Sequence, residues 1–437
     1  MTRPVALSGE GDKVSFAVPR NPRCSLCSTA CCWQQVLSKM RIVQVSTWKV
    51  ACGIAGYTEK LTANMSDYGV QCDVVPVERE LTKYMAKSEL NQYFEGMIAQ
   101  LVDYDVIHIQ HEFGFFAGAY DLDTSISVFS NFLSGLLKSQ KLIFVTFHSE
   151  PSFFEESSQG SIVRIAKKKL SESKWKLLVS RLFNSNNNLR AIVHTKNSRR
   201  VFIDSGFKSN KIHILKHGIS SIPILSIDRE EKISLKKELG FPAESIILSM
   251  FGFISHYKGY ITALRALQNL PKEYYLTIIG MPHPHGSDKT LDDIIRIINS
   301  SKNNSIRSYN LEERVKLTGY LELEALNKYY GVTDFCLAPY EPETQLSSSA
   351  AITWALASGK PVVASKIRAF TEIDEEADCF HLFTPGSARE LAYKIQNLYS
   401  DRNLQNKLVD NALNYCKDNL WSKAVEAHLQ LYQSVKL

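Results

Sequence analysis

The sequence predicts an α/β protein with two parallel-sheet domains, and three observations support this prediction. From Met40 onward, short apolar runs of strand character alternate with longer segments of helical periodicity, the pattern of parallel αβ layering. The chain of 437 residues is too long for one ordinary core and suits two domains of roughly 180–220 residues. The alternation pauses at Ile219–Asp228, which contains Pro223, and then starts again, as expected of an interdomain linker.

The predicted strands form two series, one on each side of this linker. The first series consists of Arg41–Ser46, Cys72–Val77, Val106–Gln110, Leu142–Thr146, Ala191–Thr195 and Lys211–Leu215. The second consists of Ser245–Phe251, Tyr275–Ile279, Val315–Thr318, Phe335–Ala338 and Pro361–Ala364. We therefore expect two Rossmann-like domains with a cleft between them, and ligands bound outside the carboxyl ends of the strands.

The domain boundaries follow from the same pattern. Residues 1–39 lack clear periodicity, so we expect a disordered extension there, followed by a first domain over 40–220 and a second over 221–400. Three helical segments close the chain, and we expect residues 401–437 to pack back across both domains. These segments are Ala388–Tyr399, Leu404–Asn419 and Trp421–Val435.

Composition excludes several classes of protein. No apolar run reaches the ~18–20 residues of a spanning helix, and the N-terminus lacks the pattern of a secretory signal, so we expect a cytoplasmic protein. The formal charge of +6 suits phosphorylated ligands or an anionic membrane surface but is too weak to indicate nucleic acid. Of nine cysteines, four cluster at Cys24, Cys27, Cys31 and Cys32, without a second ligand pair at zinc spacing, so we predict no metal.

Three predicted turns of the first domain contain candidate site residues. Cys52, Gly53, Gly56 and Tyr57 follow the first strand, and the glycines allow an anion or acceptor group to approach the start of a helix. The spacing is not GxGxxG, so it does not indicate a dinucleotide site.

Two histidines stand at the ends of the third and fourth predicted strands. His111 and Glu112 share one turn, and we expect both to face a sugar. His148 would donate a hydrogen bond to a sugar hydroxyl or to a leaving oxygen. A histidine that merely satisfies a strand-end carbonyl is the alternative interpretation for each ring.

The turns of the second domain predict a diphosphate site. Lys258 follows Gly252 at the start of a predicted helix, where an ammonium can neutralise phosphates. Ser347, Ser348 and Ser349 precede the predicted helix Ala350–Ala357, whose unpaired amides can hold an anion. Two further strand-end turns contribute His283 and Glu372.

Together these motifs resemble family 4 retaining glycosyltransferases of the GT-B fold. The resemblance rests on the first-strand glycines, the strand-end histidine, Gly252-x5-Lys258-Gly259, and ALASGKPVVAS followed by a glutamate, and it covers about Met40 to Leu437. The chain is most similar to a bacterial subgroup that shares its QHEFG and GFIS-YKG motifs. The resemblance implies a nucleotide-diphosphate sugar bound mainly by the second domain and an acceptor bound mainly by the first.

The sequence departs from the family pattern at three positions. Phe253 stands where the family has an arginine, and Leu346 and Trp354 replace a pair of glutamates, the second of which holds the ribose hydroxyls. Ribose recognition must therefore differ, and we expect Glu343 or Gln345 to contribute.

The resulting prediction is a retaining, metal-independent glycosyltransferase of the hexosyltransferase class. It would move a sugar from a nucleotide-diphosphate donor to a glycan, a glycolipid or another acceptor, with Lys258 and the serine amides stabilising the leaving diphosphate. Two alternatives stay open. The His111–Glu112 turn is compatible with a nucleotide-sugar 2-epimerase, and Phe253 and Trp354 are compatible with a catalytically degenerate sugar-nucleotide binder or partner subunit.

The segment 163–183 suggests a location for the protein. Its basic and apolar residues fit an amphipathic helix that could lie on an anionic membrane at the inner face, with Trp175 at headgroup depth. A helix whose apolar stripe packs on the domain core is the alternative.

Overall fold

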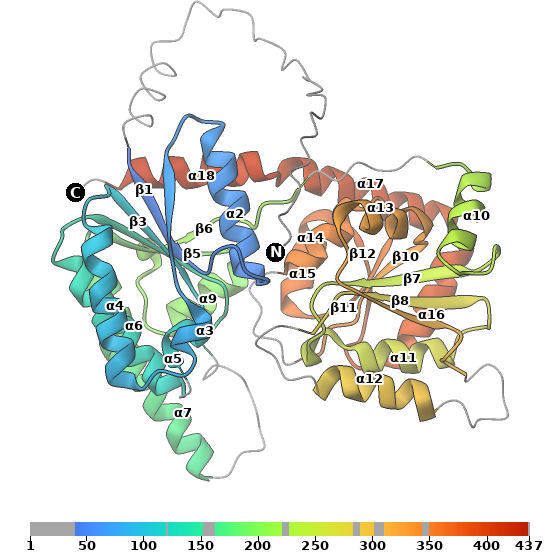
Figure 1. Ribbon diagram of the computed structural model, residues 1–437, viewed down its shortest axis with the longest axis horizontal. Coiled ribbons are helices and arrows are strands. Elements are labelled where there is room, and N and C mark those ends of the chain that lie inside the picture. The colour runs from blue at the N-terminus through green and yellow to red at the C-terminus, as the bar shows by residue number, and fades with distance from the viewer. Residues whose placement is uncertain are drawn as a thin grey trace, which may run out of the picture.

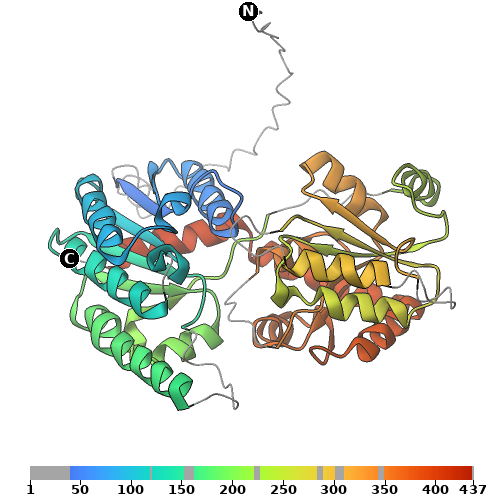
Figure 2. The same cartoon turned by 60° about the horizontal axis from the view of Figure 1, so that its bottom comes forward.

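The computed structural model describes residues 40–118, 121–151, 162–220, 227–282, 289–300, 310–342 and 349–435. It contains two six-stranded sheets, each with parallel neighbouring strands and helices on both faces (Figures 1 and 2). The predicted fold class is therefore confirmed, and each predicted strand is present. The expected extension over 1–39 lies outside the described residues.

The first domain has the strand order β2-β1-β3-β4-β5-β6. The strands are β1 (Ile42–Ser46), β2 (Cys72–Pro76), β3 (Val106–His111), β4 (Leu142–Phe147), β5 (Leu189–Val193) and β6 (Ile212–Ile214). The helices are α2 (Gly53–Ser66), α3 (Arg79–Thr82), α4 (Lys87–Leu101), α5 (Phe113–Ala117), α6 (Leu122–Leu137), α7 (Ile162–Trp175), α8 (Arg181–Ser185) and α9 (Lys196–Asp204). Strands β1, β3 and β4 are buried along their whole length, which explains their continuous apolar character.

The second domain has the order β12-β11-β10-β7-β8-β9, the doubly wound arrangement whose direction switches between β7 and β10. Its strands are β7 (Ile246–Phe251), β8 (Tyr274–Ile279), β9 (Val315–Gly319), β10 (Phe335–Ala338), β11 (Val362–Ser365) and β12 (Phe380–Phe383). Its helices are α10 (Arg229–Glu238), α11 (Tyr260–Gln268), α12 (Lys289–Ser300), α13 (Leu323–Val332), α14 (Ala350–Ala357), α15 (Arg368–Ala377) and α16 (Ala388–Ser400). The sequence did not predict β12, a four-residue edge strand.

The last two helices belong to different domains. Helix α17 (Arg402–Asp418) packs on the second domain, whereas α18 (Trp421–Ser434) lies along the first, as Figure 1 shows. Between them the chain pairs with the interdomain connection: Ile219 N–H donates to Asn419 O at 2.8 Å, and Trp421 N–H donates to Ile219 O at 3.2 Å. The two crossings between the domains therefore lie side by side.

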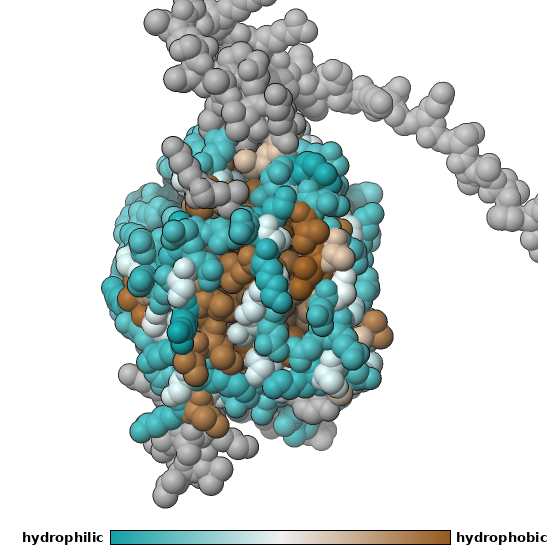
Figure 3. All heavy atoms as spheres, turned by 90° about the vertical axis from the view of Figure 1, so that its left-hand side faces the viewer, coloured by the Kyte–Doolittle hydropathy of each residue, from teal (hydrophilic) through white to brown (hydrophobic). Residues whose placement is uncertain are grey.

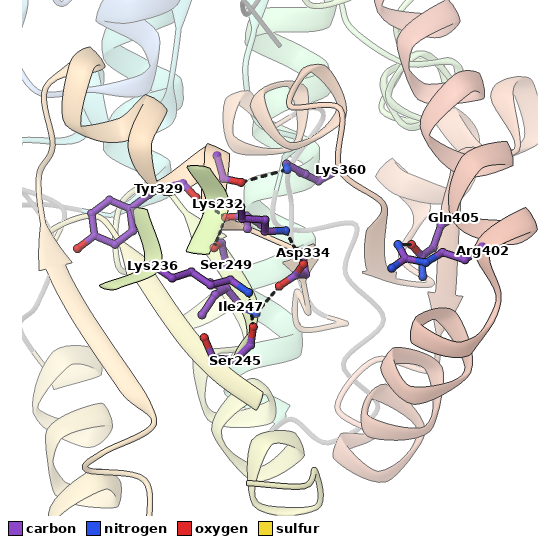
Figure 4. A network of polar contacts seen from close by, with 12 residues as sticks. Lys232, Lys236, Ser245, Ile247, Ser249, Tyr329, Asp334, Lys360, Arg402 and Gln405 are labelled. Atoms are coloured by element: carbon purple, nitrogen blue, oxygen red, sulfur yellow. Dashed lines mark hydrogen bonds and ion pairs between the residues drawn. The ribbon is translucent and has the colours of Figure 1, made fainter. Parts of the chain in front are cut away.

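A polar network fixes the end of the second sheet that lies away from the strands' carboxyl ends (Figure 4). Lys232 of α10 pairs with Asp334 at 2.6 Å, and the other carboxylate oxygen of Asp334 accepts from Ile247 N–H at 2.8 Å. Lys236 donates to Ser245 O at 2.5 Å. These contacts attach α10 to the start of β7 and leave the opposite end of the sheet for ligands.

Helix α7 and the turn after it pack on the first domain, contrary to the interfacial position expected for Trp175. The Trp175 ring is fully buried against Phe113, Phe202 and Phe207, and its Nε1–H donates to Ser205 Oγ at 3.1 Å. The apolar stripe is therefore used by the core, because tryptophan has a larger apolar area to bury than any other side chain on it. Among the described apolar side chains of this segment, Leu170 and Leu177 are exposed.

Figure 3 shows the side of the first domain that faces away from the second domain. Hydrophobic atoms gather near the centre of this side, within a mostly hydrophilic surface. No helix in the described ranges is long and apolar enough to cross a membrane.

Candidate active site

A cleft of 710 Å³ lies between the domains, where the carboxyl ends of both sheets meet. Its first-domain wall is formed by the turns after β1, β3, β4 and β6, and its second-domain wall by the turns after β7, β8 and β9 and by the start of α14. In each sheet the strand order reverses beside this cleft, between β1 and β3 and between β7 and β10. Ligands of doubly wound sheets bind at such switch points.

The turn after β1 reaches the cleft through Cys52, Gly53 and Tyr57. Helix α2 begins here without a side-chain cap, so its first amides have no capping oxygen. A Cβ added to Gly53 or Gly56 would meet no atom within 4 Å, so packing does not require glycine at either position. Gly56 is exposed but is not among the residues that line the cleft.

His111 lies in the core and does not face the cleft as the sequence suggested. The ring is fully buried and packs against Phe113, Phe116, Phe129 and Phe147. Burial lowers the pKa of His111 to about 3, so the ring is neutral near pH 7. The physical reason is the two-residue period of β3, which turns the last residue of the strand onto the apolar face.

Glu112 reaches the cleft from the residue after β3. One carboxylate oxygen accepts from Ser149 Oγ at 2.6 Å, and burial raises the pKa of the Glu112 carboxyl. Arg79, at the start of α3, lines the same wall, and burial lowers the pKa of its guanidinium. Its Nη1 is buried and has no hydrogen-bond partner among the described residues.

His148 lines the cleft at the end of β4, as the sequence predicts for a site residue. Its ring meets the Tyr57 ring edge-on at a centroid distance of 5.0 Å, and Nε2 lies 2.8 Å from Gln110 Oε1. Burial, followed by the neighbouring His194 and His217, lowers the pKa of His148 well below its ordinary value. The ring is therefore neutral at physiological pH.

The sequence analysis missed His217, which lines this wall, and Gln110, which lies behind it. His217 lines the cleft in the turn after β6, and its Nδ1 lies 2.7 Å from Gly218 O. The signal was present, because His217 comes shortly after the strand β6, as His148 comes after β4. Gln110 was missed because its side chain contacts His148 and does not line the cleft.

Lys258 lines the second-domain wall of the cleft. Its side chain is 5% exposed, and its Nζ donates to Phe251 O at 3.3 Å. Burial lowers the pKa of the Lys258 ammonium to about 7. Burial is the cause of this shift, and no described carboxylate offsets it.

The Gly-x5-Lys-Gly spacing has a steric explanation. Gly252 has a φ of +97°, and a Cβ there would lie 2.5 Å from Lys258 Nζ. Gly259 has a φ of +70°, and a Cβ there would collide with Pro339 O at 1.7 Å. Both glycines are therefore needed to place the ammonium in the cleft.

The start of α14 lies beside Lys258. Ser349, Ala350 and Ala351 line the cleft, and Ser349 Oγ lies 2.8 Å from the Tyr340 hydroxyl. No side chain caps this helix. The other predicted donor-binding residues, His283, Glu343, Gln345, Ser347 and Ser348, lie outside the described residues.

Glu372 joins the two domains and is not among the residues that line the 710 Å³ cleft; it lines a smaller pocket that shares His217 and Ser349 with the cleft, so its role at the donor stays a prediction. Its two carboxylate oxygens accept from Lys196 N–H at 2.6 Å and from Asn197 N–H at 2.9 Å. These are first-turn amides of α9 in the first domain, where a carboxylate is favoured by the unpaired N–H groups and the helix dipole. An ion pair between Lys216 and Glu376 lies on the same interdomain contact.

Aromatic rings cover the wall beside Lys258. Phe251 stacks on Tyr330 at a centroid distance of 4.6 Å, and Tyr330 is parallel to Trp354 within 4° at 6.4 Å. All three line the cleft, together with Phe253. Two of the positions where the resemblance implies charged residues therefore carry aromatic ones, which suit flat, uncharged groups such as a base or a sugar face.

Comparison with known proteins supports the fold. Residues 231–415 match the family model described as "Glycosyl transferases group 1". Anabaena HepE, solved in complex with UDP and glucose, is 15% identical with a TM-score of 0.64, over 91% of this chain and 100% of that one. Sucrose-phosphate synthase from Thermosynechococcus elongatus is 18% identical with a TM-score of 0.67, over 91% and 99%. A comparison with curated proteins gives no match. The architecture is therefore that of GT-B glycosyltransferases.

Proposed function

We propose that this protein is a glycosyltransferase that moves a sugar from a nucleotide-diphosphate donor to an acceptor held by the first domain. One observation carries the proposal: a buried lysine without a carboxylate partner among the described residues lies at the switch point of the second domain, next to an uncapped helix start. An unpaired cation and unpaired amides together form a site for an anionic group.

The same groups explain how transfer would occur. As the sugar leaves, negative charge develops on the diphosphate, and Lys258 and the first amides of α14 stabilise it where they already lie. The proposed chemistry assigns this stabilisation to the ammonium and the amides and uses no metal. Departure of the diphosphate and attack from the same face would retain the anomeric configuration.

A UDP-sugar is the donor that the comparisons favour. HepE was solved with UDP-glucose and with UDP and glucose, and an E. coli trehalose-6-phosphate protein, 12% identical with a TM-score of 0.64, was solved with UDP-2-fluoro glucose. In this chain the nucleoside would lie against Tyr330 and Trp354. The transferred sugar would then face His148 across the cleft.

One of the two alternative functions loses support from the geometry. The epimerase interpretation depends on His111 beside Glu112, and His111 is enclosed by phenylalanines. A catalytically degenerate binder would use the same anion site at Lys258 and α14, so transfer by the purified chain separates it from a transferase.

A donor screen tests the proposal. UDP-, GDP- and ADP-sugars are titrated against the protein while thermal stability is followed, because a ligand that binds the folded state raises the Tm. We expect stabilisation by a UDP-sugar, followed by transfer or slow donor hydrolysis by the purified chain. Lys258→Met should lose both, whereas Lys272→Met, at an exposed lysine of the same domain, should lose neither. Failure of every sugar nucleotide to stabilise the wild type contradicts the proposal.

For the acceptor, we propose a glycan or lipid-linked sugar, with weak attachment to anionic membrane through the outer face of 169–181. This face exposes Lys169, Leu170, Lys176, Leu177 and Arg181. Attraction between such a face and anionic lipid is screened by salt. The protein should float with anionic liposomes at low salt and be released at high salt, and a protein that stays in solution at low salt contradicts the attachment.

A further inference from the structure

A buried polar network lies beneath the first-domain wall of the cleft. Its members alternate along three neighbouring strands, so that they share one face of the sheet: Gln44 on β1, His108 and Gln110 on β3, and Thr146 on β4. All four side chains are 0–1% exposed. Strand β4 continues into His148, two residues after Thr146, and this places His148 on the same face.

The order of donors and acceptors in this network determines which nitrogen of His148 carries a proton. Gln110 Nε2 donates to Gln44 Oε1 at 2.9 Å, which turns the other end of the Gln110 amide, Oε1, toward His148 Nε2 at 2.8 Å. An amide oxygen can only accept a hydrogen bond. With the Gln110 amide in this orientation, His148 Nε2 carries the proton, and Nδ1 of the neutral ring is an acceptor.

Further contacts hold the Gln110 amide in place. His108 lies between Thr146 Oγ1 and the Tyr432 hydroxyl of α18, at 2.7 Å from each, and its Nε2 is 3.4 Å from Gln110 Nε2. Burying so many polar groups is costly unless each finds a partner, and a leucine at position 110 would avoid that cost. The network therefore calls for an explanation beyond packing.

We propose that Gln110 is a positioning residue that fixes His148 as the Nε2–H tautomer, so that this histidine serves the transferred sugar as a hydrogen-bond acceptor. The proposal rests on the proposed function only for the identity of the ligand. A hydroxyl of the sugar would donate to His148, and this corrects the expectation that His148 donates to the sugar or to the leaving oxygen. Among the described residues, the rings of Tyr57 and His194 contact His148, and His217 is a further electrostatic neighbour.

The tautomer can be measured without any assay of activity. In the full chain with ¹⁵N-labelled histidine, the His148 signals are identified by their loss in His148→Asn, and their ¹⁵N shifts report which nitrogen carries the proton. We expect Nε2–H in the wild type at neutral pH and a changed or mixed tautomer in Gln110→Leu. Nδ1–H in the wild type overturns the proposal, as does a His148 signal that Gln110→Leu leaves unchanged.

A matched set of variants separates positioning from packing. Thr146→Val removes a hydroxyl from the same network without touching His148, so it should lower the Tm and leave the His148 signals unchanged. Gln110→Glu keeps an acceptor oxygen and should restore Nε2–H. If Thr146→Val shifts the tautomer as much as Gln110→Leu does, the role of Gln110 is only structural and the proposal is wrong.

Kinetics then link the tautomer to transfer. Gln110→Leu should lower kcat about tenfold or more with little change in the donor KM, because a histidine in the wrong tautomer loses its function while the site stays intact. Gln110→Glu should recover most of that loss. An absence of transfer in the wild type contradicts the proposed function, whereas an altered tautomer with unchanged kcat contradicts the positioning role.

Discussion

The two walls of the cleft use polar groups in opposite ways. On the first-domain wall, His148 and Glu112 each have a side-chain partner, Gln110 and Ser149, and the histidine is held neutral. On the second-domain wall, Lys258 meets a backbone carbonyl, with Phe251, Tyr330 and Trp354 around it. On the first-domain wall, the histidine and the glutamate are paired before a ligand arrives, although Nη1 of Arg79 has no partner among the described residues. On the second-domain wall, the amine of Lys258 has no carboxylate beside it among the described residues, and this difference is the basis for our proposal that the second-domain wall binds the diphosphate while the first orients the sugar.

The largest effect should come from Lys258. Lys258→Met removes the cation beneath the diphosphate, and we expect transfer to fall by about 10³-fold. The same change should raise the Tm at pH 6–7, because it removes a buried charge. Thermal unfolding and a radiolabel transfer assay on the same preparation test the expected rise in Tm and the expected loss of transfer.

The pH dependence of this stabilisation has a definite sign. The folded-state pKa of Lys258 is about 7, below its ordinary value of 10.5, so between these pH values the unfolded chain binds one proton more than the folded chain. The penalty from Lys258 is therefore complete below pH 7 and fades as the pH rises toward 10.5. A Tm advantage of Lys258→Met that grows between pH 7 and pH 9 contradicts this interpretation of the second-domain wall.

His148 should give the next largest effect. His148→Ala removes the contact with the transferred sugar, and we expect kcat to fall by about 10²-fold with a smaller change in donor affinity. Steady-state kinetics with saturating donor measure the change. A loss confined to the acceptor KM would show that the first-domain wall binds the acceptor and does not serve the transition state.

Trp354 should have a moderate effect and should act on affinity. Trp354→Ala removes one ring of the aromatic wall, and a lost stacking contact of about 1–1.5 kcal/mol weakens UDP binding about tenfold. Calorimetric titration of UDP measures this directly, and Trp354→Phe serves as the matched control that keeps a ring. Unchanged affinity in Trp354→Ala would place the nucleoside elsewhere.

Glu372 should have the smallest effect on the reaction. Glu372→Ala removes the acceptor for two amides at the start of α9, and we expect a loss of about 1 kcal/mol in unfolding free energy with nearly unchanged UDP affinity. Chemical denaturation and UDP titration separate the two quantities. A large loss of UDP affinity with intact stability would return Glu372 to the donor site.

The sequence predicted most strands, because the buried runs of parallel sheets are continuous and apolar. It did not predict the edge strand Phe380–Phe383, because four residues are too few to give a recognisable apolar pattern. At the cleft it placed His148, which directly follows the buried strand β4, and Lys258, which lies in the Gly-x5-Lys-Gly segment after the buried strand β7.

Two other assignments depended on structure that the sequence does not specify. His111 and Gln110 are adjacent, and because both faces of β3 are buried, sequence alone could not decide which of them belongs with the cleft-lining histidine. The assignment of Glu372 depended on how the domains meet. That arrangement involves contacts between distant residues, such as Asn197 and Glu372, which are 175 positions apart.

The central claim is that the amine of Lys258 is largely uncharged at pH 8 before a ligand binds. It gains a proton when a diphosphate binds beside it. Calorimetric titration of UDP at pH 8, in buffers of different ionisation enthalpy, tests it directly. A bound diphosphate raises the pKa of Lys258 from about 7, so we predict uptake of close to one proton per UDP in the wild type and none in Lys258→Met. UDP binding without proton uptake, or with equal affinity and uptake in both proteins, would contradict the account.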